Sequence, residues 1–204
     1  MIHIAESDIH IVVERHAAIL QTAERLFGEK GYRGVSIEEI AKGAGVSKGL
    51  VLYHFTSKKA LLEHVLRDGM HTLMNTLLIK LNNNAQSDHS ARAKIREAVE
   101  VYLNVLKSRP DLLRIAFFEG ILGEDEGMKD ILANFTEEIL LRIDMLVQDG
   151  IATGEFRPVD SRIAARLLYG MITGLPIQAT IKLPLLPDSQ MVDEITELFC
   201  NGLR

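Results

Sequence analysis

Residues 36–62 read SIEEIAKGAGVSKGLVLYHFTSKKALL. The stretch opens on Ser36, and Glu39 follows three residues later, which is the capping-box pattern found at the start of a helix. The apolar positions that come next predict a short helix over Ile37–Lys42. A Gly-Ala-Gly sequence follows at 43–45 and favours a tight turn after this helix.

A second short helix is predicted directly after the turn. Ser47 is a suitable N-cap for a helix over Lys48–His54, and Ser57 for a longer helix after it. Two helices joined by a tight turn form the helix-turn-helix motif, whose second helix presents small or polar side chains to base edges. Here the outward positions of that second helix are Ser47, Lys48, Gly49, Tyr53 and His54.

The residues before the motif predict an arm and one further helix. Residues 1–10 mix Ile, His and acidic residues without a clear period, and we expect a flexible arm. A helix is predicted over Ile11–Glu29, with Leu26 and Phe27 on its apolar face. Gly31 suits the left-handed residue after its end. The helix-turn-helix domain is therefore expected to cover residues 11–56.

The rest of the chain also predicts helices. The fourth helix carries a stripe of Leu and Met as far as Leu81, and the polar segment 82–90 ends it. Later helices are predicted over Ala91–Lys107, Pro110–Leu122, Met128–Asp149, Ser161–Lys182 and Asp188–Gly202. We expect an all-α chain of about nine helices, in which residues 57–204 form a second, larger domain.

The spacing in the first part of the chain resembles the DNA-binding signature of the TetR family of transcriptional regulators. The resemblance covers roughly residues 15–62, and many fixed spacings together make it specific. Within the motif it rests on Ser36, Ile40-Ala41, Ala44-Gly45-Val46-Ser47, Gly49, Tyr53, His54-Phe55, Lys58 and Leu61-Leu62. Before the motif it rests on Ala23, Leu26-Phe27, Gly31-Tyr32 and Val35. The chain departs from the family where Ser36 replaces a frequent Thr and where Leu52 replaces a frequent aromatic or small residue.

The resemblance implies a repressor that binds double-stranded operator DNA as a homodimer and is released by a small, largely apolar effector of unknown identity. Lys58, at the start of the fourth helix, is expected to contact a phosphate. The alternatives are that both serines only cap their helices and that Tyr53 is a core aromatic. The predicted DNA contacts are Arg33, Ser36, Ser47, Lys48, Gly49, Tyr53, His54 and Lys58.

An effector cavity is expected between the fourth helix and the helices that follow it. Met and aromatic side chains suit an adaptable apolar cavity, although most such residues also fit an ordinary core. Glu119 is flanked by apolar residues and could meet a cationic ligand, pair with Arg114 or face water. The candidates are Met70, Met74, Leu77, Tyr102, Leu106, Leu113, Phe117, Phe118, Glu119, Met145 and Tyr169.

The last two long helices are expected to pair with those of a second copy. A two-fold operator requires a two-fold dimer, although an ordinary intrachain core is the alternative. One stripe consists of Ile163, Leu167, Gly170, Met171, Gly174 and Leu175. The other stripe consists of Ile195, Leu198, Phe199 and Gly202.

Charge and composition limit the remaining possibilities. The net charge is -5, and the first 60 residues hold eight Lys and Arg against seven Asp and Glu, so DNA recognition must rest on placed residues. Cys200, the single cysteine, lies in an apolar run and is expected to be buried. One cysteine and no recognisable signal peptide indicate the cytoplasm. The apolar stretch Leu167–Ile181 is short and interrupted by Gly and Pro, so we expect no membrane span.

No enzyme signature is present in the sequence. It lacks a G-x-S-x-G motif, a P-loop, Rossmann glycines and an H-E-x-x-H motif. His64 and His71 have no obvious carboxylate partners on the same helix face and make a poor metal site. We therefore expect no catalytic residue, no metal and no cofactor. The alternative function is a DNA-binding regulator without a small-molecule ligand, either an activator or an architectural protein.

Overall fold

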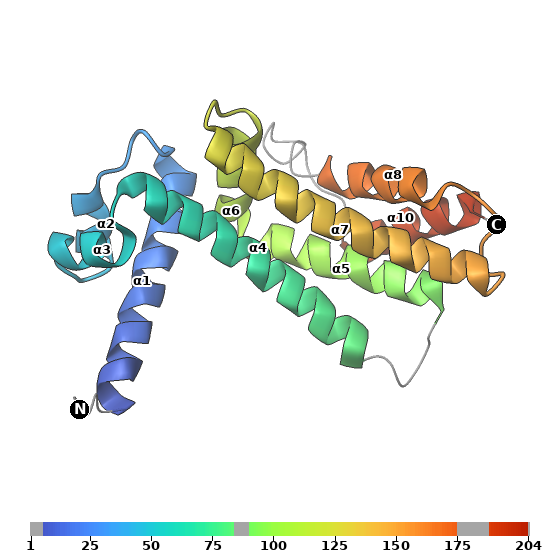
Figure 1. The fold of residues 1–204 in the computed structure, drawn as a ribbon, viewed down its shortest axis with the longest axis horizontal. Helices are drawn as coiled ribbons and strands as arrows, with labels where there is room; N and C mark the ends of the chain where they lie inside the picture. The colour runs from blue at the N-terminus through green and yellow to red at the C-terminus, as the bar shows by residue number, and fades with distance from the viewer. Residues whose placement is uncertain (1–5, 84–89, 175–187, 204) are drawn as a thin grey trace. The chain divides into compact units, whose positions relative to one another are not determined.

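The computed structural model describes residues 6–83, 90–174 and 188–203, and every element in these ranges is a helix. Nine of these are α-helices and one is a π-helix, which confirms the expected all-α fold. They are α1 (Glu6–Lys30), α2 (Ile37–Gly43), α3 (Lys48–Phe55), α4 (Lys58–Asn83), α5 (Ala91–Ser108), α6 (Pro110–Ile115), η1 (Ala116–Ile121), α7 (Glu126–Ala152), α8 (Ser161–Thr173) and α10 (Asp188–Gly202) (Figure 1). None of the described helices is long and apolar enough to span a bilayer.

The chain divides into two compact units. The first contains the described residues up to 69 together with 110–132, and the second contains residues 70–109 and 133–204 as far as they are described. Helices α4 and α7 each contribute one part to each unit. The first unit therefore contains the predicted helix-turn-helix together with α6 and η1.

The local hydrogen bonds of α2 and α3 form as the sequence predicts. Ser36 Oγ accepts from the backbone N–H of Glu39 at 3.2 Å, and the Glu39 carboxylate accepts from the Ser36 N–H at 2.8 Å. These contacts, together with the Lys30 ammonium, lower the pKa of Glu39 to about 2. Ser47 Oγ caps α3 by accepting from the N–H of Leu50 at 3.1 Å. The positions of both short helices are thus fixed by contacts within a few residues.

The core of the first unit is built from the inward faces of α1 to α4. Gly31 and Gly45 reverse the chain after α1 and α2 with φ angles of 73° and 67°, a conformation that glycine adopts most readily. The turns bring α1 onto α2 and α2 onto α3, while α1 also packs on α6. The buried side chains include Ile19, Ala23, Phe27, Ile40, Val51, Phe55, Leu61 and Leu66.

The second unit is a helical bundle in which α5 packs against α10 and α8 (Figure 1). Gly150 lets the Phe156 ring pack directly on α7, because a Cβ at this position would overlap the ring. The Glu155 carboxylate accepts from the N–H groups of Ala91 at 2.7 Å and Arg92 at 2.9 Å, which ties the turn after α7 to the start of α5. The buried side chains include Ile95, Val99, Val147, Leu168, Val192 and Cys200.

Three predicted helices differ from the observed elements by more than three residues at one end. Helix α1 begins at Glu6, so residues 6–10 of the expected arm are helical, and residues 1–5 lie outside the described residues. Acidic residues at 6 and 8 suit the first turn of a helix, which favours this earlier start. The helix predicted over Pro110–Leu122 changes from α to π after Ile115. Helix α8 ends at Thr173, and the predicted continuation to Lys182 falls mostly outside the described residues.

Candidate functional site

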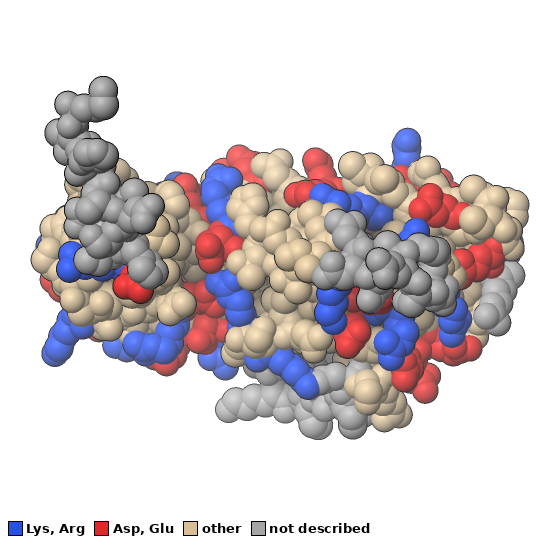
Figure 2. Space-filling view, turned by 90° about the horizontal axis from the view of Figure 1, so that it is seen from below, with Lys and Arg blue, Asp and Glu red and all other residues tan. Residues whose placement is uncertain are grey.

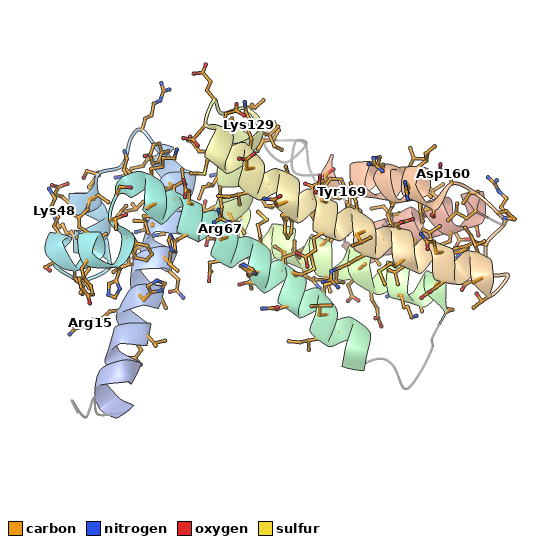
Figure 3. The ribbon with its side chains drawn as sticks, in the orientation of Figure 1. Arg15, Lys48, Arg67, Lys129, Asp160 and Tyr169 are labelled. Atoms are coloured by element: carbon orange, nitrogen blue, oxygen red, sulfur yellow. The ribbon has the colours of Figure 1, made fainter. Side chains whose placement is uncertain are left out.

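The outward side of α3 is strongly exposed. Tyr53 is 81% exposed, and Ser47, Lys48 and Gly49 are exposed beside it. Phe55 on the inward side is 1% exposed. Figure 3 shows the position of Lys48 on the helix. Tyr53 is therefore not a core aromatic, and α3 holds small and polar groups on the side that faces away from the core.

Gly49 has open space around it. A Cβ added at this position would meet a single atom within 4 Å, the Ser47 hydroxyl oxygen at 3.9 Å. The fold of α3 therefore does not require a glycine here. Leu52, which departs from the family pattern, is 36% exposed and adds an apolar group to the same helix.

The other charged and polar residues predicted to contact DNA differ in their exposure and in the contacts that their side chains already make. Lys48 forms an ion pair with Glu38 of α2, and more than half of each side chain is exposed. Arg33 is exposed in the turn between α1 and α2. The hydroxyls of Ser36 and Ser47 accept from backbone N–H groups as caps. Arg33 and Lys48 are therefore the exposed cationic side chains of this set.

Lys58 is held inside the first unit. Its Nζ donates to the carbonyl oxygens of Tyr32 at 3.0 Å and Val35 at 2.9 Å, and it lies 4.4 Å from the centre of the Tyr32 ring. These contacts fix the turn between α1 and α2 to the start of α4. The structure thus gives Lys58 a positioning role within the fold, and its contact with a phosphate stays a prediction.

His54 belongs to a group of three histidines around Phe55. Its ring lies 5.6 Å from that of His16, the His16 ring lies 4.9 Å from that of Phe55, and the His64 ring lies 5.3 Å from that of Phe55. Burial and the neighbouring His54 and His64 lower the pKa of His16 below its usual value of 6.5, while Asp68 opposes this shift. No group of three or more His, Cys, Asp or Glu within the described ranges has the arrangement of a metal site.

The charged side chains are mixed on the surface that Figure 2 shows. Lys and Arg side chains lie interspersed with Asp and Glu side chains on that face. Within the first unit, cationic side chains also pair with carboxylates, as in Arg25–Glu29 and Lys30–Glu39, both at 3.0 Å. This agrees with the near-neutral charge of the first 60 residues.

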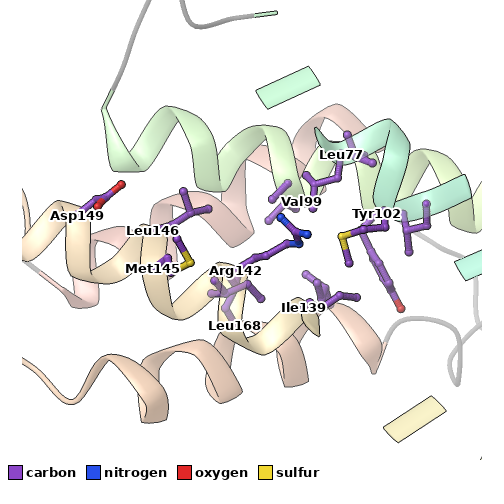
Figure 4. Close-up of a pocket in the computed structure, with 15 residues that line it drawn as sticks. Leu77, Val99, Tyr102, Ile139, Arg142, Met145, Leu146, Asp149 and Leu168 are labelled. Atoms are coloured by element: carbon purple, nitrogen blue, oxygen red, sulfur yellow. The ribbon is translucent and has the colours of Figure 1, made fainter. Parts of the chain in front are cut away.

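The second unit contains an apolar cavity of about 200 Å³ (Figure 4). It lies among the second part of α4, α5, α7 and α8. Its walls are aliphatic apart from Met74, Met145, Tyr102 and two charged residues. The lining residues are Leu73, Met74, Leu77, Ala98, Val99, Val101, Tyr102, Ile139, Arg142, Ile143, Met145, Leu146, Asp149, Leu168 and Ile172.

The predicted pocket residues fall into separate groups. Met74, Leu77, Tyr102 and Met145 line the cavity in the second unit. Tyr169 of α8 points toward α7 and its hydroxyl lies 3.0 Å from that of Thr136 (Figure 3). The side chain of Leu106 lies outside what the structure describes. Three further candidates do not line this cavity, namely Met70, Leu113 and Phe117.

Phe118 and Glu119 line a different cavity, which lies in the first unit and measures about 440 Å³. Glu119 Oε1 accepts from the backbone N–H of Tyr32 at 3.2 Å rather than pairing with Arg114. Lys59 and Asp125 form an ion pair across the same cavity at 2.7 Å, which raises the pKa of Lys59 and lowers that of Asp125. This cavity is polar, so it does not match the predicted apolar pocket.

Arg142 and Asp149 are cavity residues that the sequence analysis missed. Both lie on α7, where Ile139, Arg142, Ile143 and Leu146 recur at helical spacing. This periodicity could have identified the inward side of α7. It could not have shown that an arginine on that side meets a cavity.

The residues of the predicted dimer stripes are partly exposed. On α8, Ile163 is 58% exposed and Leu167 63%, while Gly170 and Met171 are exposed beside them. On α10, Leu198 is 67% exposed, Gly202 is exposed and Ile195 is half-buried. Phe199 is only 7% exposed and packs within its own chain. Gly174 is half-buried, and Leu175 lies outside the described residues.

Comparison with protein families gives two separate matches along the chain. Residues 19–65 match the model described as bacterial regulatory proteins, tetR family. Residues 88–177 match the model described as tetracyclin repressor-like, C-terminal domain. The first match covers the helix-turn-helix, and the second covers most of the residues that line the apolar cavity.

Similarity to individual proteins agrees with the two family matches. The HTH-type transcriptional regulator RutR of Escherichia coli (strain K12) is 31% identical over 153 residues, which are 73% of this chain and 68% of RutR. The nucleoid occlusion factor SlmA of Vibrio cholerae is 25% identical over 164 residues, 79% of this chain and 82% of SlmA. The transcriptional regulator FadR of Bacillus subtilis in complex with stearoyl-CoA has a TM-score of 0.79 at 18% identity, covering 93% of this chain and 100% of FadR.

Proposed function

We propose that this chain, which belongs to the TetR family of bacterial regulatory proteins, is a repressor that binds a palindromic operator as a homodimer and is released by a small apolar effector. The observation that carries the DNA-binding part is the exposed side of α3. An aromatic side chain that is 81% exposed, beside a lysine and an open glycine, has no role in the core of the unit. A helix with such a side suits the major groove.

Each exposed group of the motif has a role in this proposal. Lys48 leaves its exposed ion pair with Glu38 to contact DNA, which costs little because exposed pairs contribute about 0–1 kcal/mol. Tyr53 and His54 contact backbone phosphates, and Gly49 allows the helix to approach the bases. Arg33 adds a phosphate contact from the turn before α2. Ser36 and Ser47 act mainly as caps, because their hydroxyls are already engaged.

The exposed stripes on α8 and α10 support the homodimer. Isolated large apolar residues on a surface are ordinary, but residues that recur at helical spacing suggest an interface. Ile163, Leu167 and Met171 recur in this way on one side of α8. A dimer built on α8 and α10 would pair two helix-turn-helix motifs, as a palindromic site about 34–36 Å from centre to centre requires. Because operator DNA is the proposed partner, we also place the protein's action in the cytoplasm.

The apolar cavity of the second unit supports the effector part of the proposal. It lies in the region that matches the C-terminal family model, and it is lined by side chains of four helices. An effector acts only if it binds the released state more tightly than the DNA-bound state. A regulator without an effector remains the alternative, and the likeness to a protein named as a nucleoid occlusion factor favours keeping it.

Selection from random DNA by the purified full chain tests the DNA-binding part. We expect enrichment of an inverted repeat, and loss of that enrichment in a Lys48→Ala, Tyr53→Ala double variant. Tyr32, an aromatic of the same unit that is not on α3, supplies a Tyr32→Phe control that keeps the enriched sequence. Enriched sequences without two-fold symmetry would contradict binding as a symmetric dimer.

Blocking the cavity tests the effector part. Ala98 lines the cavity, and an Ala98→Phe substitution would fill part of its volume. We expect operator binding to persist in this variant and release by cellular metabolite extracts to be lost. If the wild-type chain stays on the operator under every extract, the alternative without an effector is favoured.

A further inference from the structure

One arginine lies in the wall of a largely apolar cavity. The lining side chains that carry polar atoms beyond a thioether are Tyr102 of α5 and Arg142 and Asp149 of α7. Figure 4 shows the Arg142 guanidinium extending from α7 toward α5, between Val99 and Tyr102. A permanent positive charge among aliphatic side chains is costly unless acceptors surround it.

Arg142 has a buried N–H group without an acceptor among the described residues, while about a third of its side chain is exposed (33%). A guanidinium carries five N–H donors, and here Nη2 donates to Glu138 Oε1 at 2.8 Å. Nε is buried and has no acceptor within the described ranges. Half of the Glu138 side chain is exposed, so the pair lies at the edge of the cavity. The guanidinium is thus held at one end and keeps donors available for another acceptor.

Asp149 does not supply that acceptor. It lies at the end of the cavity away from Tyr102 (Figure 4), and its carboxylate pairs with Lys94 at 3.7 Å. The acidic group of the cavity therefore has a basic partner of its own. In the part of the chain that the structure describes, the cavity group that still lacks a hydrogen-bond acceptor is the Nε–H of Arg142.

Tyr102 carries the other polar group of the cavity wall, at the end opposite Asp149. Burial raises the pKa of its hydroxyl, and the nearby Tyr169 acts in the same direction, so the group stays protonated at neutral pH. A protonated phenol can donate to an oxygen of a ligand. The two polar groups of this part of the cavity are thus both donors.

We propose that the effector is an apolar carboxylate whose carboxylate group accepts hydrogen bonds from Arg142, while its hydrocarbon part fills the space between α5, α7 and α8. Arginine binds carboxylates with two parallel hydrogen bonds, and these charge-assisted bonds are about twice as strong as neutral ones. The remaining walls of the cavity are aliphatic side chains and two thioethers, which suit a hydrocarbon chain. This inference rests on the proposed role of the cavity as the effector site.

Three ligands with the same chain and different head groups test the proposal. Hexanoate, hexanol and hexylamine are titrated by calorimetry into the full chain, and acetate controls for binding of a carboxylate without a chain. We expect hexanoate to bind about tenfold more tightly than hexanol, because it alone forms charge-assisted bonds with Arg142. Hexylamine and acetate should bind more weakly still. Hexanoate should also weaken operator binding.

Variants then assign the preference to one residue. Arg142→Met should reduce hexanoate affinity about tenfold and leave hexanol affinity unchanged, since only the charged contact is removed. Arg142→Lys should keep part of the preference, because an ammonium retains the charge without the planar fork. Arg114→Met changes an exposed arginine of the first unit and is the matched control, with wild-type affinities expected.

The outcomes separate this inference from the effector assignment. If the three ligands bind equally, or if hexylamine binds most tightly, the carboxylate proposal is wrong and the cavity remains an effector site. If none of the three binds to the wild-type chain, both the carboxylate proposal and the proposed role of the cavity fail. The comparison of head groups on the wild-type chain decides between these results even if Arg142→Met does not fold.

Discussion

Gly49 allows DNA contact to be tested apart from folding. Alanine favours a helix over glycine by about 1 kcal/mol, and a Cβ at this position would make only an ordinary contact with the Ser47 hydroxyl oxygen at 3.9 Å, so Gly49→Ala should not destabilise the first unit. The added methyl group would nevertheless keep α3 from approaching base edges. We expect operator affinity to fall about tenfold, or about 1.4 kcal/mol, as measured by fluorescence anisotropy at fixed salt. Unchanged affinity in a folded variant would rule out close approach here.

Lys48 and Lys58 both belong to the motif, yet the structure predicts that only the replacement of Lys58 lowers the free energy of unfolding substantially. Lys58→Met removes a charged group that donates to two carbonyl oxygens, so we expect a loss of about 1.5–3 kcal/mol in the free energy of unfolding. Lys48→Met breaks one exposed ion pair and should change stability by less than about 1 kcal/mol.

Salt dependence completes the comparison of the two lysines. If Lys48 neutralises a phosphate, its removal should reduce the slope of log affinity against log salt by about 1. Lys58→Met should leave the slope unchanged under conditions where the variant is folded. A reduced slope for Lys58→Met instead would restore this residue to the set of phosphate contacts.

Contacts among α1, α3 and α4 predict that acid weakens the first unit. The pKa of His16 is lowered by burial and by His54 and His64, so the unfolded chain binds a proton more readily than the folded one. The stability from neutral His16 is therefore present above pH 6.5 and is lost as pH falls from 6.5 toward the lowered pKa. Urea unfolding should show a smaller loss between about pH 7.5 and about pH 5.5 in His16→Gln than in the wild type.

A second histidine variant serves as the control for this pH effect. His71 is exposed on α4, and His71→Gln should follow the wild-type pH dependence. If His16→Gln and His71→Gln lose the same stability as the wild type over this range, the environment of His16 does not determine the acid sensitivity.

The elements differ in how far the sequence could predict them. Helices α2 and α3 were predicted to within a residue at each end, because Ser36 and Ser47 act on backbone groups three residues away. The π-helix was not predicted, because its geometry accompanies a long-range contact in which Gly120 admits the Leu132 side chain. Arg142 was missed for a similar reason. Its place in the wall of the same cavity as Tyr102 depends on how α5 and α7 are arranged, and periodicity along one helix contains no such information.

At the scale of the whole molecule, the covalent path between the two units limits how an effector could act. Helices α4 and α7 each contribute residues to both units, and both also line the apolar cavity through their parts in the second unit. The C-terminal part of α4 supplies Leu73, Met74 and Leu77, whereas its start carries Lys58. A ligand that shifts either helix would therefore act on an element that continues into the helix-turn-helix unit, which is the minimum that the proposed release requires.

The proposed dimer predicts that operator binding depends on residues far along the chain from α3. Leu167→Glu and Leu198→Glu each place a carboxylate on an exposed stripe, and in a two-fold dimer each would bring like charges together. We expect these variants to sediment as monomers and to lose operator affinity by about a thousandfold or more, the usual gap between specific and non-specific binding. Ligand binding in the cavity should persist, because neither residue lines it.

Leu141→Glu is the matched control, since Leu141 of α7 is 59% exposed but lies outside the stripes. If Leu141→Glu dissociates the protein while the stripe variants remain dimeric, the subunits pair through α7, and the operator geometry must be worked out from that surface instead.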